Sequence, residues 1–471
     1  MKKLNVAAIV IFGMILLVPL VTFNFKPNQI SVIDNRMLTD LPSLNMGLIE
    51  YIKTLDIYFQ DRIGLRTAMI TSSEILQDKL FGVLTHPEYA NGKDGYVFFK
   101  VNPQLTDYNY VSDFANFTAK LQKYCNDRGV NFLFSLDPNK QIVYQQYLPD
   151  GVNYKNDRVT DLLNDLTKDK VNHVYTAPAL IAASKTSQVY NVKYDAGHWN
   201  DNGAFVGISL MLENIKKDYP SLTLPAKSDY NISYVLNTTL PQSYFPIHEE
   251  DVLYTPKEPE AVEADKYKDE IKLNSTGWYY SDYVNPSKPN APKILVFMGS
   301  YFENKEKFIA DNFSETVFVH SYLNVQDFDY YFNLFHPDIV LFQSADYATD
   351  DAYYPQKLIN DVNYNLAYKL VQNLPVTPFA GVPGNAGQEL LDTAQKSKTQ
   401  LTDFSLDITG KEIAYAYARI DGQIDDFKVD SSGNKQTIDI TLDKSTILNA
   451  KNIQLMLISA DKKQQNVITL R

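Results

Sequence analysis

The chain of 471 residues carries 44 basic and 56 acidic residues, for a formal net charge of −12, and 45% of its residues are hydrophobic. This composition indicates a globular protein, and the length allows more than one domain. Nucleic acid is not an expected partner, because phosphate binding requires a concentrated basic surface that an acidic chain disfavours.

Residues 1–25 predict a membrane anchor. Lys2 and Lys3 precede an uncharged run from Leu4 to Phe23, and about twenty such residues can cross a bilayer as a helix. The positive flank would keep the N-terminus in the cytoplasm, so we expect a single-pass protein of the cell membrane with the remaining chain outside. A cleaved signal peptide is the alternative, but the run lacks the small-residue cleavage pattern.

Residues 26–100 predict a mainly helical segment that belongs to the same domain as the region after it. Apolar residues recur at helical spacing over 47–81, and Asp61–Arg66 interrupt that pattern. Gly92–Phe99 are typical of a turn that leads into a strand.

Residues 101–380 predict an α/β domain. Buried-type strands alternate with helices, which indicates a mainly parallel sheet flanked by helices. Residues 220–290 lack this rhythm and predict an insertion of loops and short strands. We expect strands near 130–136, 173–176, 188–191, 294–297, 316–320 and 338–342, and helices near 157–169, 203–217, 302–313 and 325–335.

Beyond this domain the pattern changes. Glycines and a proline over 381–400 indicate a linker. From 401 to 471, apolar residues alternate with polar ones, as in Phe404, Leu406 and Ile408. This period of two predicts a small all-β domain, sandwich-like in type.

Cysteine content limits the available chemistry. The only cysteine, Cys125, excludes an internal disulfide and a cysteine-rich metal site. Because Cys125 lies in a helical pattern, we interpret it as a buried small apolar residue rather than a catalytic thiol. No metal site is predicted.

Three residues could form a serine nucleophile system. Ser300 follows an apolar strand, and ligands bind at the carboxyl ends of the strands in an open parallel sheet. Asp195 and His198 are spaced so that, on a turn, the carboxylate reaches one imidazole nitrogen while the other faces the cleft. The Ser300 N–H could then stabilise an oxyanion.

At this point the chain resembles a known family, the alginate O-acetyltransferases of AlgJ/AlgX type in the SGNH-hydrolase superfamily. The resemblance covers roughly residues 30–350, and the block over 51–99 is its most specific part. The similar segments, in order, are Asp34-Asn35-Arg36 with Leu41-Pro42, Tyr58–Arg66, Leu80-Phe81-Gly82, Gly92–Phe98, Pro138-Asn139-Lys140 with Tyr144 and Leu148-Pro149, Asp195 to Trp199 with Gly203, and Gly299-Ser300-Tyr301.

The order of the motifs supports the resemblance. Ordinary SGNH hydrolases place the serine early, whereas this family places the acid and the histidine before it, as Asp195, His198 and Ser300 stand here. The resemblance implies an SGNH-hydrolase-like fold and these three as the catalytic residues. It also implies secondary roles in oxyanion stabilisation or substrate binding for Asn139, Lys140 and Tyr301.

The implied activity is O-acetylation of an exopolysaccharide or cell-wall polysaccharide through an acetyl-serine intermediate. No cofactor is expected, since a membrane-bound O-acyltransferase partner would supply the acetyl group. The N-terminal helix would hold the domain at the membrane beside it. Two alternatives remain open: a polysaccharide acetyl esterase with the same triad, and a non-catalytic polysaccharide-binding or assembly protein on an SGNH scaffold.

Overall fold

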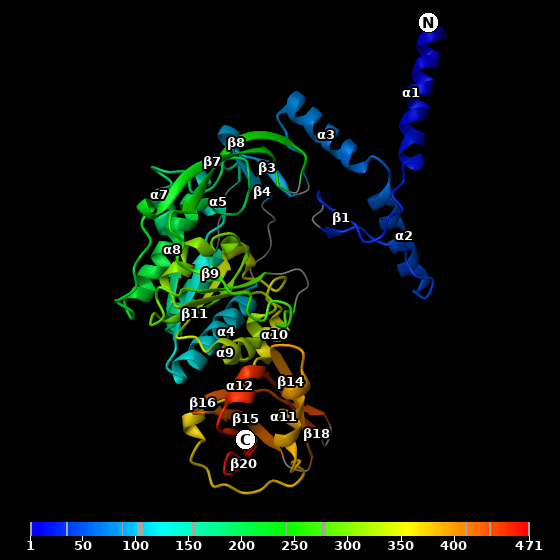
Figure 1. Ribbon diagram of the computed structural model, residues 1–471. Helices are drawn as coiled ribbons and strands as arrows, with labels where there is room; N and C mark the ends of the chain where they lie inside the picture. Colours follow the sequence, from blue (N-terminus) through cyan, green and yellow to red (C-terminus); the bar gives the residue numbers. More distant parts are fainter. Residues whose placement is uncertain are drawn as a thin grey trace.

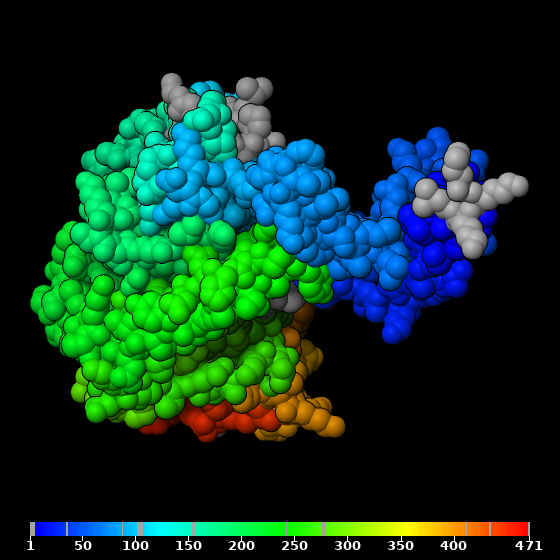
Figure 2. Space-filling view, turned by 90° about the horizontal axis from the view of Figure 1, so that it is seen from above, coloured from blue at the N-terminus to red at the C-terminus, as the bar shows by residue number. Residues whose placement is uncertain are grey.

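The computed structural model describes residues 2–33, 36–86, 88–100, 107–152, 154, 157–241, 243–274, 279–409, 412–432 and 435–469. Asp34 and Asn35 of the predicted family motif lie outside them. An N-terminal arm projects from a large α/β body, and a small β domain lies at the opposite end of that body (Figure 1). Seen from above, the dark-blue start of the arm stands clear of the body, whereas its lighter blue part adjoins the body (Figure 2).

A seven-stranded sheet forms the centre of the body, in the order β6-β5-β13-β11-β12-β10-β9. The strands from β6 to β12 are all parallel, whereas β10 runs antiparallel to β12 and to β9. Their bounds are β5 Asn131–Asp137, β6 His173–Tyr175, β9 Val262–Glu263, β10 Tyr280–Val284, β11 Lys293–Met298, β12 Glu315–His320 and β13 Ile339–Ala345. The predicted α/β fold with a mainly parallel sheet is therefore confirmed.

Two apolar layers enclose this sheet because successive strand residues point to opposite faces. In β11, Val296 packs in one core with Ile208 of α8, whereas Phe297 packs in the other with Phe114 of α4. The covering helices are α4 Tyr108–Asp127, α6 Asp157–Lys168, α7 Ala177–Ala183, α8 Asp201–Lys216, α9 Phe328–Phe335 and α10 Gln356–Asp361. Cys125 is fully buried in α4, as predicted.

Two predicted elements are wrong. Residues 302–313 form three short 3₁₀ turns, Ser300–Phe302, Glu306–Phe308 and Ala310–Asn312, instead of one helix. Residues 188–191 form no strand, because the backbone N–H of Val189 donates to the hydroxyl of Tyr144 and not to a neighbouring strand. Burial of Val189 and Tyr190 explains the strand-like pattern.

The inserted region is more regular than predicted. β7 Tyr230–Thr239 and β8 Pro246–Pro256 form a long antiparallel hairpin. This hairpin lies over the top of the body, beside the short pair β3 Tyr89–Asn91 and β4 Val97–Phe99 (Figure 1).

The C-terminal β strands form two sheets, β14-β18-β17 and β16-β15-β19-β20, that share one core. Their bounds are β14 Leu401–Thr409, β15 Ile413–Ile420, β16 Gln423–Phe427, β17 Val429–Ser432, β18 Lys435–Asp443, β19 Ile453–Ser459 and β20 Gln465–Thr469, with α12 at Lys444–Asn449. Within the predicted linker, α11 Ala386–Lys396 buries Ala386, Leu390 and Ala394 in the same core.

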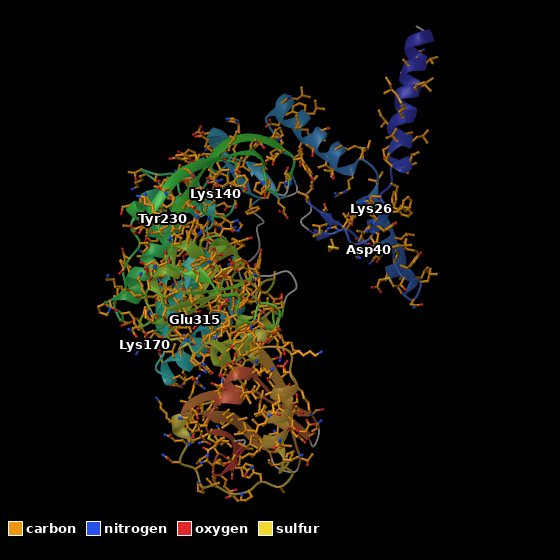
Figure 3. The ribbon with its side chains drawn as sticks, viewed as in Figure 1. Lys26, Asp40, Lys140, Lys170, Tyr230 and Glu315 are labelled. Carbon is orange, nitrogen blue, oxygen red and sulfur yellow. The ribbon has the colours of Figure 1, made fainter. Side chains whose placement is uncertain are left out.

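The N-terminal arm contains α1 Lys2–Val21, the small pair β1 Ile30–Ser31 and β2 Arg36–Met37, and the helices α2 Leu48–Arg62 and α3 Arg66–Phe81. Leu65 breaks the α2–α3 helical pattern with φ of 59°. Asp61 of α2 forms an ion pair with Arg36 at 2.7 Å. Figure 3 shows Lys26 and Asp40 beside α2, where the Arg62 guanidinium donates to both residues.

The predicted membrane-spanning helix over residues 4–23 is not confirmed. In the portion of the chain that the structure describes, no helix is both long and apolar enough to cross a membrane. α1 ends at Val21, and Pro19 lies in its last turn, where the Pro19 carbonyl accepts from the N–H of Gly64.

Candidate active site

Ser300, His198 and Asp195 meet at the carboxyl end of β11. The Ser300 Oγ lies 2.8 Å from His198 Nε2, and His198 Nδ1 lies 2.8 Å from a carboxylate oxygen of Asp195. The side chains of His198 and Asp195 are each 30% exposed, so the group is open to a ligand. The structure thus brings together all three residues that the sequence predicted for a nucleophile system.

A tight turn positions the acid and the histidine. Asp195 adopts the left-handed conformation, with φ of 52°, and its carboxylate accepts from the N–H groups of Gly197 and His198 at 3.1 and 2.9 Å. Gly197 is required because a Cβ atom there would lie 2.2 Å from the Phe99 ring. Asn200 then caps α8 by accepting from the N–H of Gly203.

The charges of the pair are coupled. Burial by itself would raise the pKa of Asp195, but the His198 charge and the hydrogen bonds from His198 and Gly197 lower it to about 2. Burial disfavours the charged form of His198, yet the Asp195 carboxylate outweighs this effect and raises the His198 pKa above its ordinary value. Asp195 is therefore an anion that stabilises an imidazolium.

Tyr301 holds the histidine turn against the serine loop. Its hydroxyl donates to the carbonyl oxygens of Gly197 and Pro138, at 2.7 and 2.9 Å, and its own carbonyl accepts from Trp199 Nε1 at 2.7 Å. The side chain is 1% exposed. Tyr301 is therefore buried beneath the site, and the expectation that it binds substrate or an oxyanion is not supported by its position.

The side chains of Asn139 and Lys140 form structural hydrogen bonds away from Ser300. The Asn139 side chain accepts from the N–H of Ile142 and donates to the hydroxyl of Tyr154 at 2.5 Å. Lys140 is fully buried, and its Nζ donates to the carbonyls of Val97 and Val192 at 2.7 and 3.0 Å. The label of Lys140 lies beneath the β7–β8 hairpin in Figure 3. Neither side chain reaches Ser300 in its described contacts.

Glu249 is a site residue that the sequence analysis missed. Its carboxylate, on β8, accepts from three successive N–H groups, those of Val192, Lys193 and Tyr194, at 2.5, 2.7 and 2.6 Å. It thereby fixes the backbone that leads into Asp195. No local signal could have revealed this role, because more than fifty residues separate Glu249 from the segment that it holds.

Gln343 fixes the approach to the nucleophile. It lies in β13, and its Oε1 accepts from the N–H of Gly299 at 2.7 Å while its Nε2 donates to Asp137 at 2.9 Å. Asp137 also accepts from Ser135 and Thr176. This buried network consumes the Gly299 N–H and sets the direction in which β11 delivers Ser300.

Two tyrosines flank Ser300, and the sequence analysis also missed them. Ser300, Tyr322 and Tyr347 each stand two residues beyond the end of a strand, β11, β12 and β13 respectively. Those strands are neighbours, with β11 in the middle. The common offset was a readable signal, because the carboxyl ends of adjacent parallel strands lie at one sheet edge.

The loop after Ser300 is anchored to α8. Asp201, which is 2% exposed, pairs with Lys305 at 2.6 Å and also with Lys307. These two ion pairs draw the 3₁₀ turns toward the first turn of α8. Among the described residues, no group of three or more His, Cys, Asp or Glu side chains could hold a metal ion.

Comparison with known proteins identifies part of this body. The family described as an SGNH hydrolase-like domain, acetyltransferase AlgX, matches residues 90–275. The matched segment covers less than half of the chain. It contains Asp195 and His198 and ends before Ser300. The predicted family and superfamily are therefore confirmed for this part of the chain.

Solved structures resemble larger parts of the chain. PatB1 of Bacillus cereus is 21% identical over 55% of this chain and 96% of its own, with a TM-score of 0.43. The O-acetyltransferase domain of Pseudomonas putida AlgJ is 14% identical over 59% and 100%, with a TM-score of 0.42. AlgX of Pseudomonas aeruginosa is 12% identical over 82% and 90%, with a TM-score of 0.38. No curated protein sequence matches the chain.

Proposed function

We propose that this protein is an O-acetyltransferase that acetylates hydroxyl groups of an exopolysaccharide or cell-wall polysaccharide outside the cytoplasmic membrane. The observation that carries the proposal is the continuous chain of contacts from Asp195 through His198 to the Ser300 Oγ, with 2.8 Å at each step. The AlgX-family match over residues 90–275 supports acetyl transfer as its chemistry.

In the first step, Ser300 attacks the carbonyl carbon of an acetyl donor. The Oγ–carbon bond forms, the carbonyl π pair moves onto oxygen, and the serine proton passes to His198 Nε2. Asp195 keeps the Nδ1 proton in place and stabilises the imidazolium. Collapse of the tetrahedral intermediate expels the donor's leaving group, which takes the proton from His198 and leaves acetyl-Ser300.

In the second step, a sugar hydroxyl attacks the carbonyl carbon of acetyl-Ser300. His198 removes the hydroxyl proton, the sugar oxygen bonds to the acetyl carbon, and the bond between that carbon and the Ser300 Oγ breaks as Oγ takes the proton back from His198. The residues of the site supply both steps without a cofactor. We propose that a membrane-bound O-acyltransferase partner supplies the acetyl group, because cytoplasmic acetyl donors do not reach a site outside the membrane.

The test is acetyl transfer by the full-length purified protein. Incubation with 4-nitrophenyl acetate and a surface oligosaccharide should give an acetylated sugar, and Ser300→Ala should lower the rate on the order of 10⁴-fold or more. Release of acetate alone, with removal of acetyl groups from an acetylated glycan, would indicate an esterase. Failure of Ser300 to react with a fluorophosphonate would identify a non-catalytic scaffold instead.

A further inference from the structure

An oxyanion at this site needs hydrogen-bond donors, and several nearby donor groups already donate to other acceptors. The Gly299 N–H donates to Gln343, the Asn139 amide donates to Tyr154, and the Lys140 ammonium donates to two backbone carbonyls. Preorganised donors aimed at the developing charge are usually the largest contribution to acyl-transfer catalysis. The backbone N–H of Ser300 alone would be a sparse set.

The two flanking tyrosines stand where further donors are needed. Met298 pairs with His320 in the parallel register of β11 and β12, so Ser300 and Tyr322 stand at the same level of the sheet. Tyr347 follows β13 on the other side of β11. A Cβ atom placed on Gly299 would lie 3.8 Å from the Tyr322 hydroxyl oxygen, so that hydroxyl lies over the backbone at the nucleophile.

Ser300 interacts with both phenol groups, because it acts on the pKa of Tyr322 and on that of Tyr347. The Ser300 hydroxyl has one proton to donate and two lone pairs with which to accept. With the Asp195 carboxylate at Nδ1, neutral His198 carries its proton there, and Ser300 donates its own proton to Nε2. The Ser300 oxygen then keeps two lone pairs, one for each tyrosine hydroxyl.

The rings of the two tyrosines are fixed by packing, and their hydroxyl groups keep their protons. The Tyr353 ring packs edge-on against Tyr322 at 4.9 Å and against Tyr347 at 5.8 Å. Burial is the main cause that raises the pKa of both Tyr322 and Tyr347, and the neighbouring Ser300 opposes it only in part. Both phenols therefore stay protonated at any pH at which His198 can act as a base.

We propose that Tyr322 and Tyr347 are catalytic residues whose hydroxyls stabilise the oxyanion of the tetrahedral intermediate. As the Ser300 Oγ–carbon bond forms, the serine lone pairs become weaker acceptors and the π electrons of the carbonyl collect on its oxygen. That oxygen is bonded to the carbon that Oγ attacks, so both phenol O–H groups, which stand beside Ser300, donate to the oxyanion. These hydrogen bonds are released when the carbonyl re-forms and the leaving group departs with the His198 proton.

This inference rests on the proposed function only in requiring Ser300 as the nucleophile. Tyr322→Phe, Tyr347→Phe and the double variant remove the hydroxyls and keep the rings. Tyr353→Phe is the matched control, because it lies in the same cluster and has no described hydrogen bond with Ser300. Steady-state kinetics with 4-nitrophenyl acetate, without a sugar acceptor, report on acylation and hydrolysis alone.

Each single variant should lower kcat on the order of 10²-fold with little change in KM, since one oxyanion donor is lost. Tyr353→Phe should remain near wild type. The loss should be the same from pH 6 to pH 9, because the phenols do not titrate there. Unchanged kcat in both single variants overturns the inference, and so does a rise in KM alone, which would indicate substrate binding instead.

Two further outcomes are informative. Wild-type protein that hydrolyses the ester but acetylates no sugar refutes the transferase function and leaves the oxyanion assignment intact. Ester hydrolysis that survives Ser300→Ala overturns both. If a Phe variant unfolds on heating more readily than wild type, fluorinated tyrosines at 322 and 347 retain the hydroxyl, and an acylation rate that does not change with phenol acidity overturns the inference.

Discussion

At the scale of single residues, Asp195 combines an unusual backbone conformation with a carboxylate that forms several hydrogen bonds at once. Its φ of 52° is tolerated by aspartate better than by most residues. One carboxylate holds two backbone N–H groups and the Nδ1 of His198. The same atoms therefore shape the turn, select the histidine tautomer and set its basicity.

We predict that kcat/KM rises with pH through the raised pKa of His198, because only neutral imidazole accepts the Ser300 proton. Asp195→Asn should lower kcat about 10⁴-fold, since the imidazole loses its anionic partner and its tautomer. It should also move the rising limb of the profile to lower pH. A rising limb that does not move in Asp195→Asn would contradict the assigned pairing.

The same pair predicts a pH-dependent stability. Because the pKa of His198 is raised in the folded protein, His198 contributes to the free energy of unfolding at pH values below its unfolded-state pKa of about 6.5. This contribution is lost as the pH rises through the pKa of His198 in the folded protein. Asp195, whose pKa is lowered in the folded protein, contributes to the free energy of unfolding at pH values above its unfolded-state pKa, and this contribution is lost as the pH falls toward about 2. Asp195→Asn should therefore destabilise most between about pH 4 and 6.5, measured by urea unfolding; an equal cost at pH 5 and pH 9 would refute this.

At the scale of elements, the inserted hairpin and the strand ends build the site together. β8 supplies Glu249 to the backbone before Asp195, β4 supplies the Val97 carbonyl to Lys140, and β13 supplies Gln343 to the serine loop. Each contact joins segments that are distant in the chain. Positioning of the site is therefore a property of packed elements rather than of its local motifs.

Glu249→Gln tests the role of the hairpin. An amide has one acceptor oxygen in place of two and brings its own donors toward three N–H groups, so we expect a loss of about 1–3 kcal/mol in the free energy of unfolding and a lower kcat. Glu250→Gln is the control, because Glu250 is exposed on the same strand. Equal unfolding midpoints for the two variants would refute the role of Glu249.

Lys140 tests the buried contact between β4 and the 188–192 segment. Burial lowers its pKa from 10.5 to about 7, and the unfolded chain therefore binds more protons than the folded protein between these values. The free energy of unfolding should rise with pH from about 7 to 10, and Lys140→Met should flatten that rise while lowering stability at pH 10. A parallel pH dependence in wild type and Lys140→Met would contradict this account.

Sequence patterns predicted the elements whose causes are local. The apolar runs of β5, β11, β12 and β13 and the position of Ser300 after β11 were readable in this way. Residues 302–313 were not, because Lys305 and Lys307 are drawn to Asp201, about a hundred residues earlier, and short 3₁₀ turns replace a helix. Asn139 looked available because its partner Tyr154 could not be inferred from spacing.

At the scale of the whole molecule, a buried ion pair joins the body to the C-terminal β domain. Arg128, after α4, stacks over the Tyr124 ring at 3.5 Å and pairs with Asp426 of β16 at 3.2 Å. Asp426 also accepts from the Tyr124 hydroxyl at 2.5 Å. Burial raises the pKa of Asp426 to about 7 although the Arg128 charge opposes this.

Arg128→Ala should leave Asp426 buried without its cation and cost about 3–5 kcal/mol. We expect this cost to be greater at pH 8 than at pH 5, because Asp426 can be neutralised by protonation at the lower pH. Lys123→Ala is the control, since its ion pair with Asp127 on the same helix is exposed and should contribute little. Denaturant unfolding with equal costs for both variants would contradict an interdomain role for Arg128.

The most direct test of the central claim is to locate the acetyl group on the enzyme. After brief incubation with 4-nitrophenyl acetate and acid quenching, peptide mass spectrometry should find one acetyl group on the peptide that contains Ser300. His198→Ala should abolish this adduct, and addition of an acceptor oligosaccharide should deplete it in wild type. An unmodified Ser300 peptide in wild type, or equal acetylation of that peptide in His198→Ala, would contradict an acetyl-serine mechanism.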